Sequence, residues 1–162
     1  MRRRRILAAL LALCAATAHA HGNEKHARPS PDYQAEQKDW GIVGDKRAIT
    51  RTIAIAMTDD MRFTPDRITV NEGETVRFVA KNRGRMLHEM VIGTTGELKA
   101  HAALMAKYPN MEHDEPWMVH VDPGKTGEIV WHFNRAGRFE FACLIPGHYA
   151  AGMRGAIIVT QR

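Results

Sequence analysis

Short runs of alternating or β-branched residues, separated by turn residues, follow one another through most of the sequence. The turns include Asn71-Glu72-Gly73 and Asp122-Pro123-Gly124, whose residue types favour tight reversals of the chain. Because half-buried strands need a second sheet to cover their apolar faces, the pattern predicts an all-β fold, a Greek-key β-sandwich of about eight strands. The predicted strands are 52–57, 67–70, 74–81, 87–92, 117–121, 126–134, 138–142 and 155–160.

One segment breaks this strand pattern and predicts a helix. Thr94 and Glu97 have the spacing of a capping box, in which each side chain accepts a hydrogen bond from the other residue's backbone N–H. The residues that follow, 98–107, are rich in Ala, Leu, Met and Lys, which favour helix formation. We therefore expect one helix of about three turns inserted between two strands.

The first 20 residues have the features of a secretory signal peptide. Four arginines at positions 2–5 precede an apolar stretch from Ile6 to Ala16, and Ala18 and Ala20 fit the A-x-A cleavage pattern. The apolar stretch is shorter than the roughly 20 residues needed to span a bilayer. We expect residues 1–20 to be removed on export to the periplasm, leaving a chain without membrane attachment.

Removal of the four arginines lowers the formal net charge from +5 to +1. A net charge this small does not indicate a surface that binds nucleic acid. Residues 21–48 are polar, contain Pro29 and Pro31 and lack periodicity, so they predict a flexible N-terminal arm. The domain is predicted to span residues 49–162.

The stretch with the most chemical information places a thiol, an imidazole and a thioether at Cys143, His148 and Met153, with four residues between neighbours. Cys143 is the only cysteine left after signal removal, although cysteines usually pair in oxidising compartments. Phe139, Phe141 and Cys143 share one strand face, so the thiol should point into one end of the sandwich. Thiolate, imidazole and thioether ligands favour copper over magnesium or calcium, and His88 in the strand 87–92 supplies a second imidazole.

On these residues, the segment from about Ile49 to Thr160 resembles the cupredoxins, the single-domain type 1 copper proteins that include plastocyanin, auracyanin and rusticyanin. The resemblance implies a cupredoxin-like sandwich that binds one copper ion, Cu+ or Cu2+, through His88, Cys143, His148 and an axial Met153. It also implies an apolar docking patch around His148. The residues available for that patch are Leu144, Ile145, Pro146, Tyr149, Ala150 and Ala151.

A narrower resemblance, carried by the polar arm, the segment 57–65 and the extra Met and His residues, is to periplasmic cupredoxins linked to bacterial copper tolerance. The sequence departs from many cupredoxins at Glu89, directly after His88, where they have Asn or Ser. Those residues tie the two ligand loops together through hydrogen bonds, so the departure puts the rigidity of the loops in question.

The mature chain holds more methionine and histidine than one type 1 site uses. A mixed group of thioethers and imidazoles is able to bind further copper. The alternative is that Met57, Met90 and Met105 fill the core, with His101 and His132 exposed to solvent. The candidates for an accessory copper site are His21, His26, Met111, His113, Met118 and His120.

Two functions remain open from the sequence. The first is copper homeostasis and tolerance in the periplasm with redox cycling of the metal, which leaves oxidation of cuprous ion open as an activity. The alternative is a dedicated electron-transfer carrier whose redox partner docks near His148. A hydrolase with Cys143 as nucleophile and His148 as base is disfavoured, because Met153 would have no role and no orienting Asp or Asn is indicated. We expect a monomeric copper-binding protein rather than an enzyme.

Overall fold

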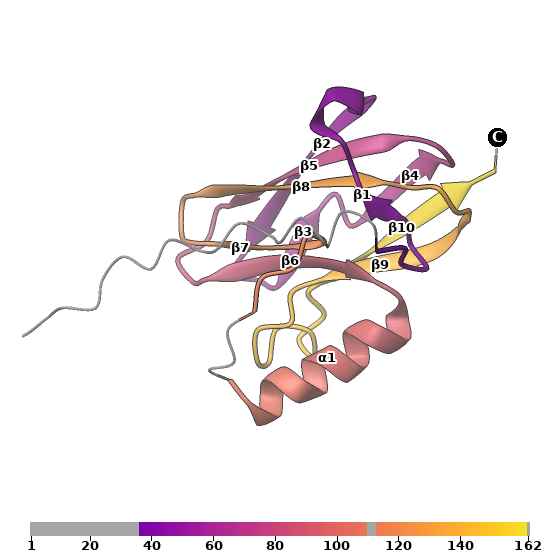
Figure 1. Cartoon of the computed structure of the whole chain (residues 1–162). Coiled ribbons are helices and arrows are strands. Elements are labelled where there is room, and N and C mark those ends of the chain that lie inside the picture. The colour runs from indigo at the N-terminus through magenta and orange to yellow at the C-terminus, as the bar shows by residue number, and fades with distance from the viewer. Residues whose placement is uncertain (1–35, 110–112, 162) are drawn as a thin grey trace, which may run out of the picture.

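The computed structural model describes residues 36–109 and 113–161 as two five-stranded sheets packed face to face, with one α-helix against the second sheet (Figure 1). The strand order is β1-β8-β5-β2-β3 in the first sheet and β4-β10-β9-β6-β7 in the second. The elements are β1 (Ile42–Val43), β2 (Arg51–Thr58), β3 (Arg62–Thr64), β4 (Arg67–Asn71), β5 (Thr75–Asn82), β6 (His88–Gly93), α1 (Thr95–Lys107), β7 (Met118–Val121), β8 (Thr126–His132), β9 (Gly137–Ala142) and β10 (Arg154–Thr160), with a short 3-10 turn at Lys46–Ala48.

The core follows from the period-two alternation of the strands. In β2, Ile53, Ile55 and Met57 are buried, while the residues between them are exposed or half-buried. β5 runs parallel to β2 and β10 runs parallel to β4, whereas the other pairings between strands are antiparallel. In both sheets, strands that are distant in the sequence are hydrogen-bonded neighbours. The two sheets confirm the predicted all-β sandwich.

Strand β6 is buried along its whole length. One of its faces meets the central core, through Met90 and Ile92. The other face meets a smaller apolar cluster in which Val91 packs with Leu98 and Met105 of α1. The helix therefore covers the outer face of the second sheet over β6 and β9.

Each of the eight predicted strands is present, and the helix begins at the predicted capping box. The Thr94 hydroxyl accepts from the Glu97 backbone N–H at 3.3 Å, and the Glu97 carboxylate accepts from the Thr94 N–H at 3.3 Å. The structure adds two short strands, β1 and β3. They have two and three residues, too few for alternation to be recognised in the sequence.

The described part of the predicted arm, residues 36–48, packs on the sandwich. Trp40 is 3% exposed, and its carbonyl accepts a hydrogen bond of 2.8 Å from Nε1 of Trp131. Ile42 and Val43 pair with His132 and Trp131 as an additional edge strand. Burial of the large Trp40 ring fixes this segment, although its composition is polar. Residues 1–35, with the predicted signal peptide and the rest of the arm, lie outside the described residues.

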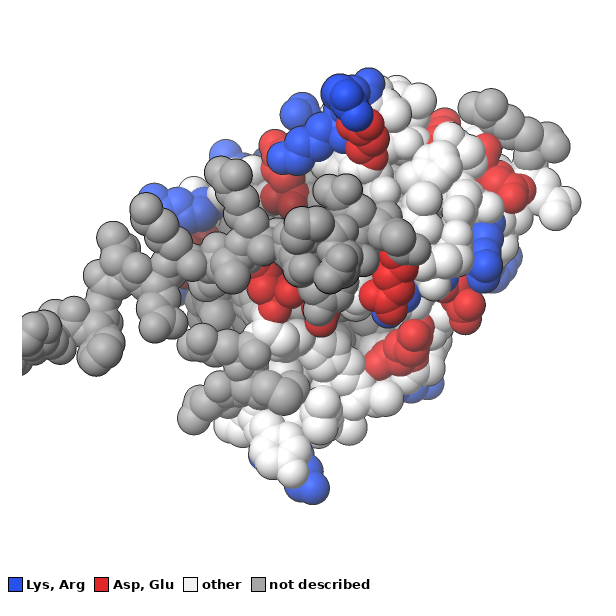
Figure 2. Space-filling model, viewed as in Figure 1, with Lys and Arg blue, Asp and Glu red and all other residues white. Residues whose placement is uncertain are grey.

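Acidic and basic side chains are interspersed over the described part of the face drawn in Figure 2. This mixture agrees with the small net charge predicted for the chain without its first 20 residues. Among the described residues, no helix is both long and apolar enough to cross a membrane.

Candidate metal centre

Cys143 and His148 lie on a loop whose two ends are joined by backbone hydrogen bonds. Cys143 follows the last residue of β9 and donates its N–H to the carbonyl of Met153 at 3.1 Å. Met153, just before β10, donates its own N–H to the carbonyl of His148 at 3.0 Å. Gly147 and Gly152 have φ angles of 91° and 95°, a region that favours glycine and allows the tight reversals. These backbone hydrogen bonds therefore fix the positions of the Cys143 and His148 residues that carry the thiol and the imidazole.

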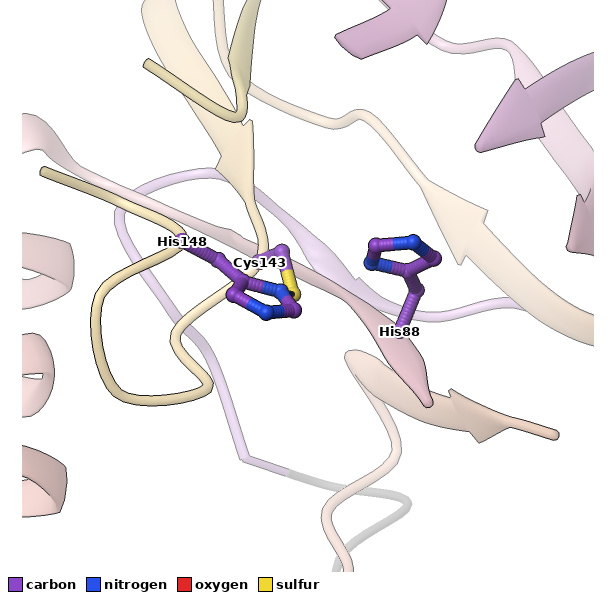
Figure 3. A group of neighbouring side chains, drawn as sticks. All are labelled: His88, Cys143 and His148. Carbon is purple, nitrogen blue, oxygen red and sulfur yellow. Dashed lines mark hydrogen bonds between the residues drawn. The ribbon is translucent and has the colours of Figure 1, made fainter. Parts of the chain in front are cut away.

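His88, from the start of β6, completes a compact group of three side chains. One ligand atom from each of His88, Cys143 and His148 lies within 4.8 Å of the other two. Sγ of Cys143 is 3.2 Å from Nδ1 of His148, and the centres of the two imidazole rings are 5.1 Å apart. Figure 3 shows the two rings and the thiol pointing into a common space. The structure thus brings together three of the four residues predicted as ligands.

The His88 ring has one nitrogen engaged and one without a partner. Nε2 lies 3.0 Å from Oδ1 of Asp59, whereas Nδ1 is buried and has no hydrogen-bond partner among the described residues. The pKa of Asp59 is lowered, chiefly by the hydrogen bond that its carboxylate accepts from the Arg85 backbone N–H. The ionised carboxylate accepts from Nε2–H, which leaves the lone pair of Nδ1 for a metal ion.

Burial sets the protonation of the other two side chains. It raises the pKa of the Cys143 thiol to about 12 and lowers the pKa of His148. At neutral pH without metal, the thiol is therefore protonated and the His148 imidazole is neutral. A metal ion that binds here replaces the thiol proton, and the resulting thiolate with two imidazoles is a soft donor set that suits copper.

Glu89 ties the strand that carries His88 to the loop that carries Cys143. Its backbone N–H donates to Sγ of Cys143 at 3.4 Å, and its carboxylate accepts from the Leu144 backbone N–H at 2.7 Å. The second carboxylate oxygen lies 2.8 Å from Nε2 of His120, whose pKa this contact raises. Glu89 is 1% exposed. The departure from the Asn or Ser of the cupredoxins that the sequence resembles therefore does not leave the loops unconnected, because the Glu89 carboxylate supplies the acceptor.

Met153 is fully buried in the same apolar cluster as Cys143.

Asp59 belongs to the surroundings of the site, although the sequence did not identify it as a site residue. It lies in the segment 57–65 that carried the narrower resemblance, yet its contact with His88 joins residues 29 positions apart. A carboxylate beside a metal-binding histidine has no fixed spacing in sequence, so no local signal marked it.

The predicted docking patch needs one correction. Leu144 is 1% exposed and packs with Leu98 and Met105 under the helix, so it cannot contribute to a surface. The remaining five residues of the patch are half-buried or exposed. Ile145 and Tyr149 are half-buried, whereas Pro146, Ala150 and Ala151 are exposed.

The accessory candidates separate into three groups. His21, His26 and Met111 lie outside the described residues. Met118 is buried in the cluster under α1, and Met57, Met90 and Met105 fill the interior as predicted. His113 and His120 come together, with ring centres 6.1 Å apart.

The two histidines predicted to be exposed are both half-buried. His101 packs its ring 4.6 Å from that of His113, because α1 lies against the sheet and turns this position toward the neighbouring segment. His132 lies with Nδ1 2.9 Å from the Thr75 hydroxyl.

Comparison with known proteins gives a consistent result. The sequence model of the copper-binding proteins of the plastocyanin/azurin family matches residues 50–160. The copper-resistant cuproprotein CopI of Rubrivivax gelatinosus is 50% identical over 155 residues, 94% of each chain. CopI of Pseudomonas aeruginosa is 35% identical over 162 residues, 82% of this chain and 87% of that protein.

Solved structures support the fold. The reduced auracyanin of Roseiflexus castenholzii superposes with a TM-score of 0.59 at 24% sequence identity, over 69% of this chain and 98% of that chain. Three observations point to the same family: the family model matches most of the chain, the fold is shared with a solved auracyanin, and His88, Cys143 and His148 lie together. The chain therefore belongs to the plastocyanin/azurin family of copper-binding proteins, the cupredoxins.

Proposed function

We propose that this protein is a periplasmic copper-tolerance cupredoxin that holds one copper ion through His88, Cys143 and His148, with the Met153 thioether in the axial position. The observation that carries the proposal is the buried His88 Nδ1, which has no hydrogen-bond partner within residues 36–109 and 113–161 and lies beside a thiol and a second imidazole. The relatives named copper-resistant cuproproteins, at 50% and 35% identity, support a role in copper tolerance. The signal-peptide features of residues 1–20 support the periplasm.

Bound copper would supply one-electron chemistry by cycling between Cu+ and Cu2+. The residues of the chain keep the donors in place in either state. Asp59 fixes the orientation of the His88 ring, and the paired ends of the loop fix Cys143. Because these contacts exist before the metal arrives, little rearrangement of the protein has to accompany a change in charge.

Electrons would enter and leave through His148. His88 and Cys143 are fully buried, whereas His148 is partly exposed. Its exposed neighbours in the loop, Pro146 and Ala150, are apolar. This surface supports the second candidate function, a dedicated electron carrier that docks briefly with a redox protein. In the first function, the same route would serve oxidation of cuprous ion by an external acceptor.

A copper titration of the chain without residues 1–20 tests the proposal. We expect the visible thiolate-to-copper band to rise in step with bound copper and to saturate at one equivalent. Absence of this band at full copper loading would overturn the type 1 site.

Deletion of the gene separates the two functions. Copper tolerance predicts poor growth in elevated copper, restored by the wild-type chain and not by Cys143→Ser. Normal growth in copper, together with loss of an electron-transfer reaction, would instead assign the carrier function.

A further inference from the structure

Two exposed apolar side chains lie directly beside the candidate metal centre. Four large hydrophobic side chains are exposed among the described residues, and two of them, Met86 and Leu87, are consecutive and 42% exposed each. They precede His88, whose ring centre is 5.1 Å from that of His148. Exposed apolar residues that gather beside a functional group mark a place where another molecule docks. The apolar surface at this end of the sandwich consists of Met86, Leu87, Pro146, Ala150 and Ala151.

Four exposed arginines lie on the chain segments that form or contact this apolar surface. Two of them belong to the connection between β5 and β6, which also carries Met86 and Leu87. The other two are placed by contacts with the loop between β9 and β10. Nη1 of Arg62 lies 3.3 Å from the carbonyl oxygen of Ala151, and Cζ of Arg154 lies 5.6 Å from the centre of the Tyr149 ring. The arginine group consists of Arg62, Arg83, Arg85 and Arg154.

The chain does not neutralise the positive charge of the arginine group. Within residues 36–109 and 113–161, none of the four guanidinium groups forms an ion pair with a carboxylate. The same segments carry Asp59 and Asp60, and Asp59 is engaged by the Arg85 backbone N–H. The β7–β8 turn at this end adds Asp122 and Lys125, which cancel. Five positive and three negative charges leave this end of the sandwich with an excess of positive charge.

We infer that the arginine group and the apolar surface together dock a redox protein that carries carboxylates around its own exposed redox centre. The inference rests on the proposed electron route through His148 and adds to it the charge of the partner. Protein interfaces commonly combine an apolar centre with a polar margin, and arginine is enriched in them. Unpaired guanidinium groups attract carboxylates at a distance and form paired hydrogen bonds with them on contact. They repel a partner whose redox centre is surrounded by lysines.

Two forms of one haem protein test the charge of the partner. Native cytochrome c presents lysines around its haem edge, and succinylation converts these lysines to carboxylates. The copper-loaded chain without residues 1–20 is mixed with each form in a stopped-flow spectrometer. One electron passes from Cu+ to ferric haem, giving Cu2+ and ferrous haem, or the reverse where the potentials require it. At low ionic strength, we expect the second-order rate constant to be about tenfold or more higher with the succinylated form.

Salt separates this preference from a difference in driving force. The preference should disappear in about 1 M salt, where the Debye length is about 3 Å. Equal rate constants at low ionic strength, or a higher one with native cytochrome c, would overturn the proposal. A preference that persists unchanged in 1 M salt would overturn it too, because charge attraction would not be its cause.

Removal of two arginines locates the docking surface. Arg83→Gln/Arg85→Gln should lower the rate constant with succinylated cytochrome c by about threefold or more and keep the thiolate band. Arg47→Gln/Arg138→Gln is the matched control, since it removes the same charge from exposed positions before β2 and near the start of β9, away from this surface. An equal loss of rate in the control would assign the effect to net charge and overturn the site. If the first variant fails to fold, Arg154→Gln should lower the rate in its place.

Binding without electron transfer distinguishes this inference from the proposed function. Heteronuclear NMR under reducing conditions follows a diamagnetic chain whether or not Cu+ is bound. Succinylated cytochrome c should shift the amide signals of residues 83–87 and 145–151. These shifts in a chain that transfers no electron would support the docking surface and reject the redox route. Shifts confined to other residues would overturn the surface. Retention on phosphatidylglycerol vesicles, without a preference between the cytochromes, would assign the arginine group to a lipid surface and also overturn the proposal.

Discussion

Asp59 holds the ring of His88 by Nε2, with 3.0 Å between that nitrogen and Oδ1 of the carboxylate. The same carboxylate accepts the backbone N–H of Arg85 at 2.8 Å, so the turn after β2 is joined to the loop before β6. Gly84 permits this approach, because a Cβ at that position would overlap the Asp59 carboxylate. One carboxylate thereby orients the ring, fixes which nitrogen carries the proton and shapes the loop.

The carboxylate–histidine pair predicts that Asp59 tunes metal binding without touching the metal. Asp59→Ala should lower copper affinity by about 10- to 100-fold, the usual effect of losing a partner of a ligating histidine. Asp59→Asn should lose less, since its amide oxygen still accepts from Nε2–H. Affinity is measured by competition with a chelator of known strength. Asp60→Ala, at the exposed neighbouring position, is the matched control, and equal affinities for the two alanine variants would exclude this role.

The sequence was sufficient for the fold class and for the three gathered donors. Alternation identified the long strands, and Cys143 and His148 could be recognised from residue type and local spacing. Asp59 could not be recognised, because its contact with His88 depends on how the turn after β2 meets a loop 29 positions away. A contact between residues this far apart in the chain produces no periodic pattern of residue types in the sequence.

The burial of Leu144 and His101 was missed for one common reason. The resemblance assigned Leu144 to the docking patch, and His101 was expected to be exposed on the predicted helix; neither prediction included a second apolar cluster on the outer face of the sheet. Helix α1 instead covers that outer face, and Leu144 packs with Leu98 and Met105 beneath it. The capping box predicted that a helix forms, but its docking position depends on tertiary contacts.

Glu89 should be needed for stability as well as for the site. Glu89→Ala leaves the buried Leu144 N–H without its 2.7 Å acceptor, which costs about 1–3 kcal/mol of unfolding free energy. Glu89→Gln keeps an acceptor oxygen and should lose less. Urea unfolding of the metal-free protein measures both. Glu128→Ala, at an exposed carboxylate on β8, is the control and should stay within about 0.5 kcal/mol of the wild type.

Cys143→Ser should abolish the visible absorption of the cupric protein. A serine hydroxyl fills nearly the same volume, so the fold is retained, but it does not provide the thiolate that gives rise to the band. The absorption spectrum after copper loading is the measurement. Full colour in this variant would contradict the type 1 assignment.

Met153→Leu should retain copper and change its reduction potential. The two side chains have similar volumes, so the buried position tolerates the exchange. Loss of the weak thioether donor and a more apolar surrounding disfavour the more highly charged cupric state, so the potential should rise. Spectroelectrochemical titration measures the shift. Complete loss of copper would instead make the thioether a principal ligand.

Copper affinity should rise with pH well beyond the ordinary thiol range. The pKa of Cys143 in the metal-free protein is about 12, so at every pH below this value binding has to displace one proton. The pKa of His148 is lowered, so its ring is already neutral at pH 7 and adds no second proton there. Cuprous affinity, measured anaerobically by chelator competition, should therefore increase about tenfold per pH unit from pH 7 to 9. A thiol with an ordinary pKa of about 8.5 would level off within that range, and Cys143→Ser should remove the slope, because no proton then leaves the ligand.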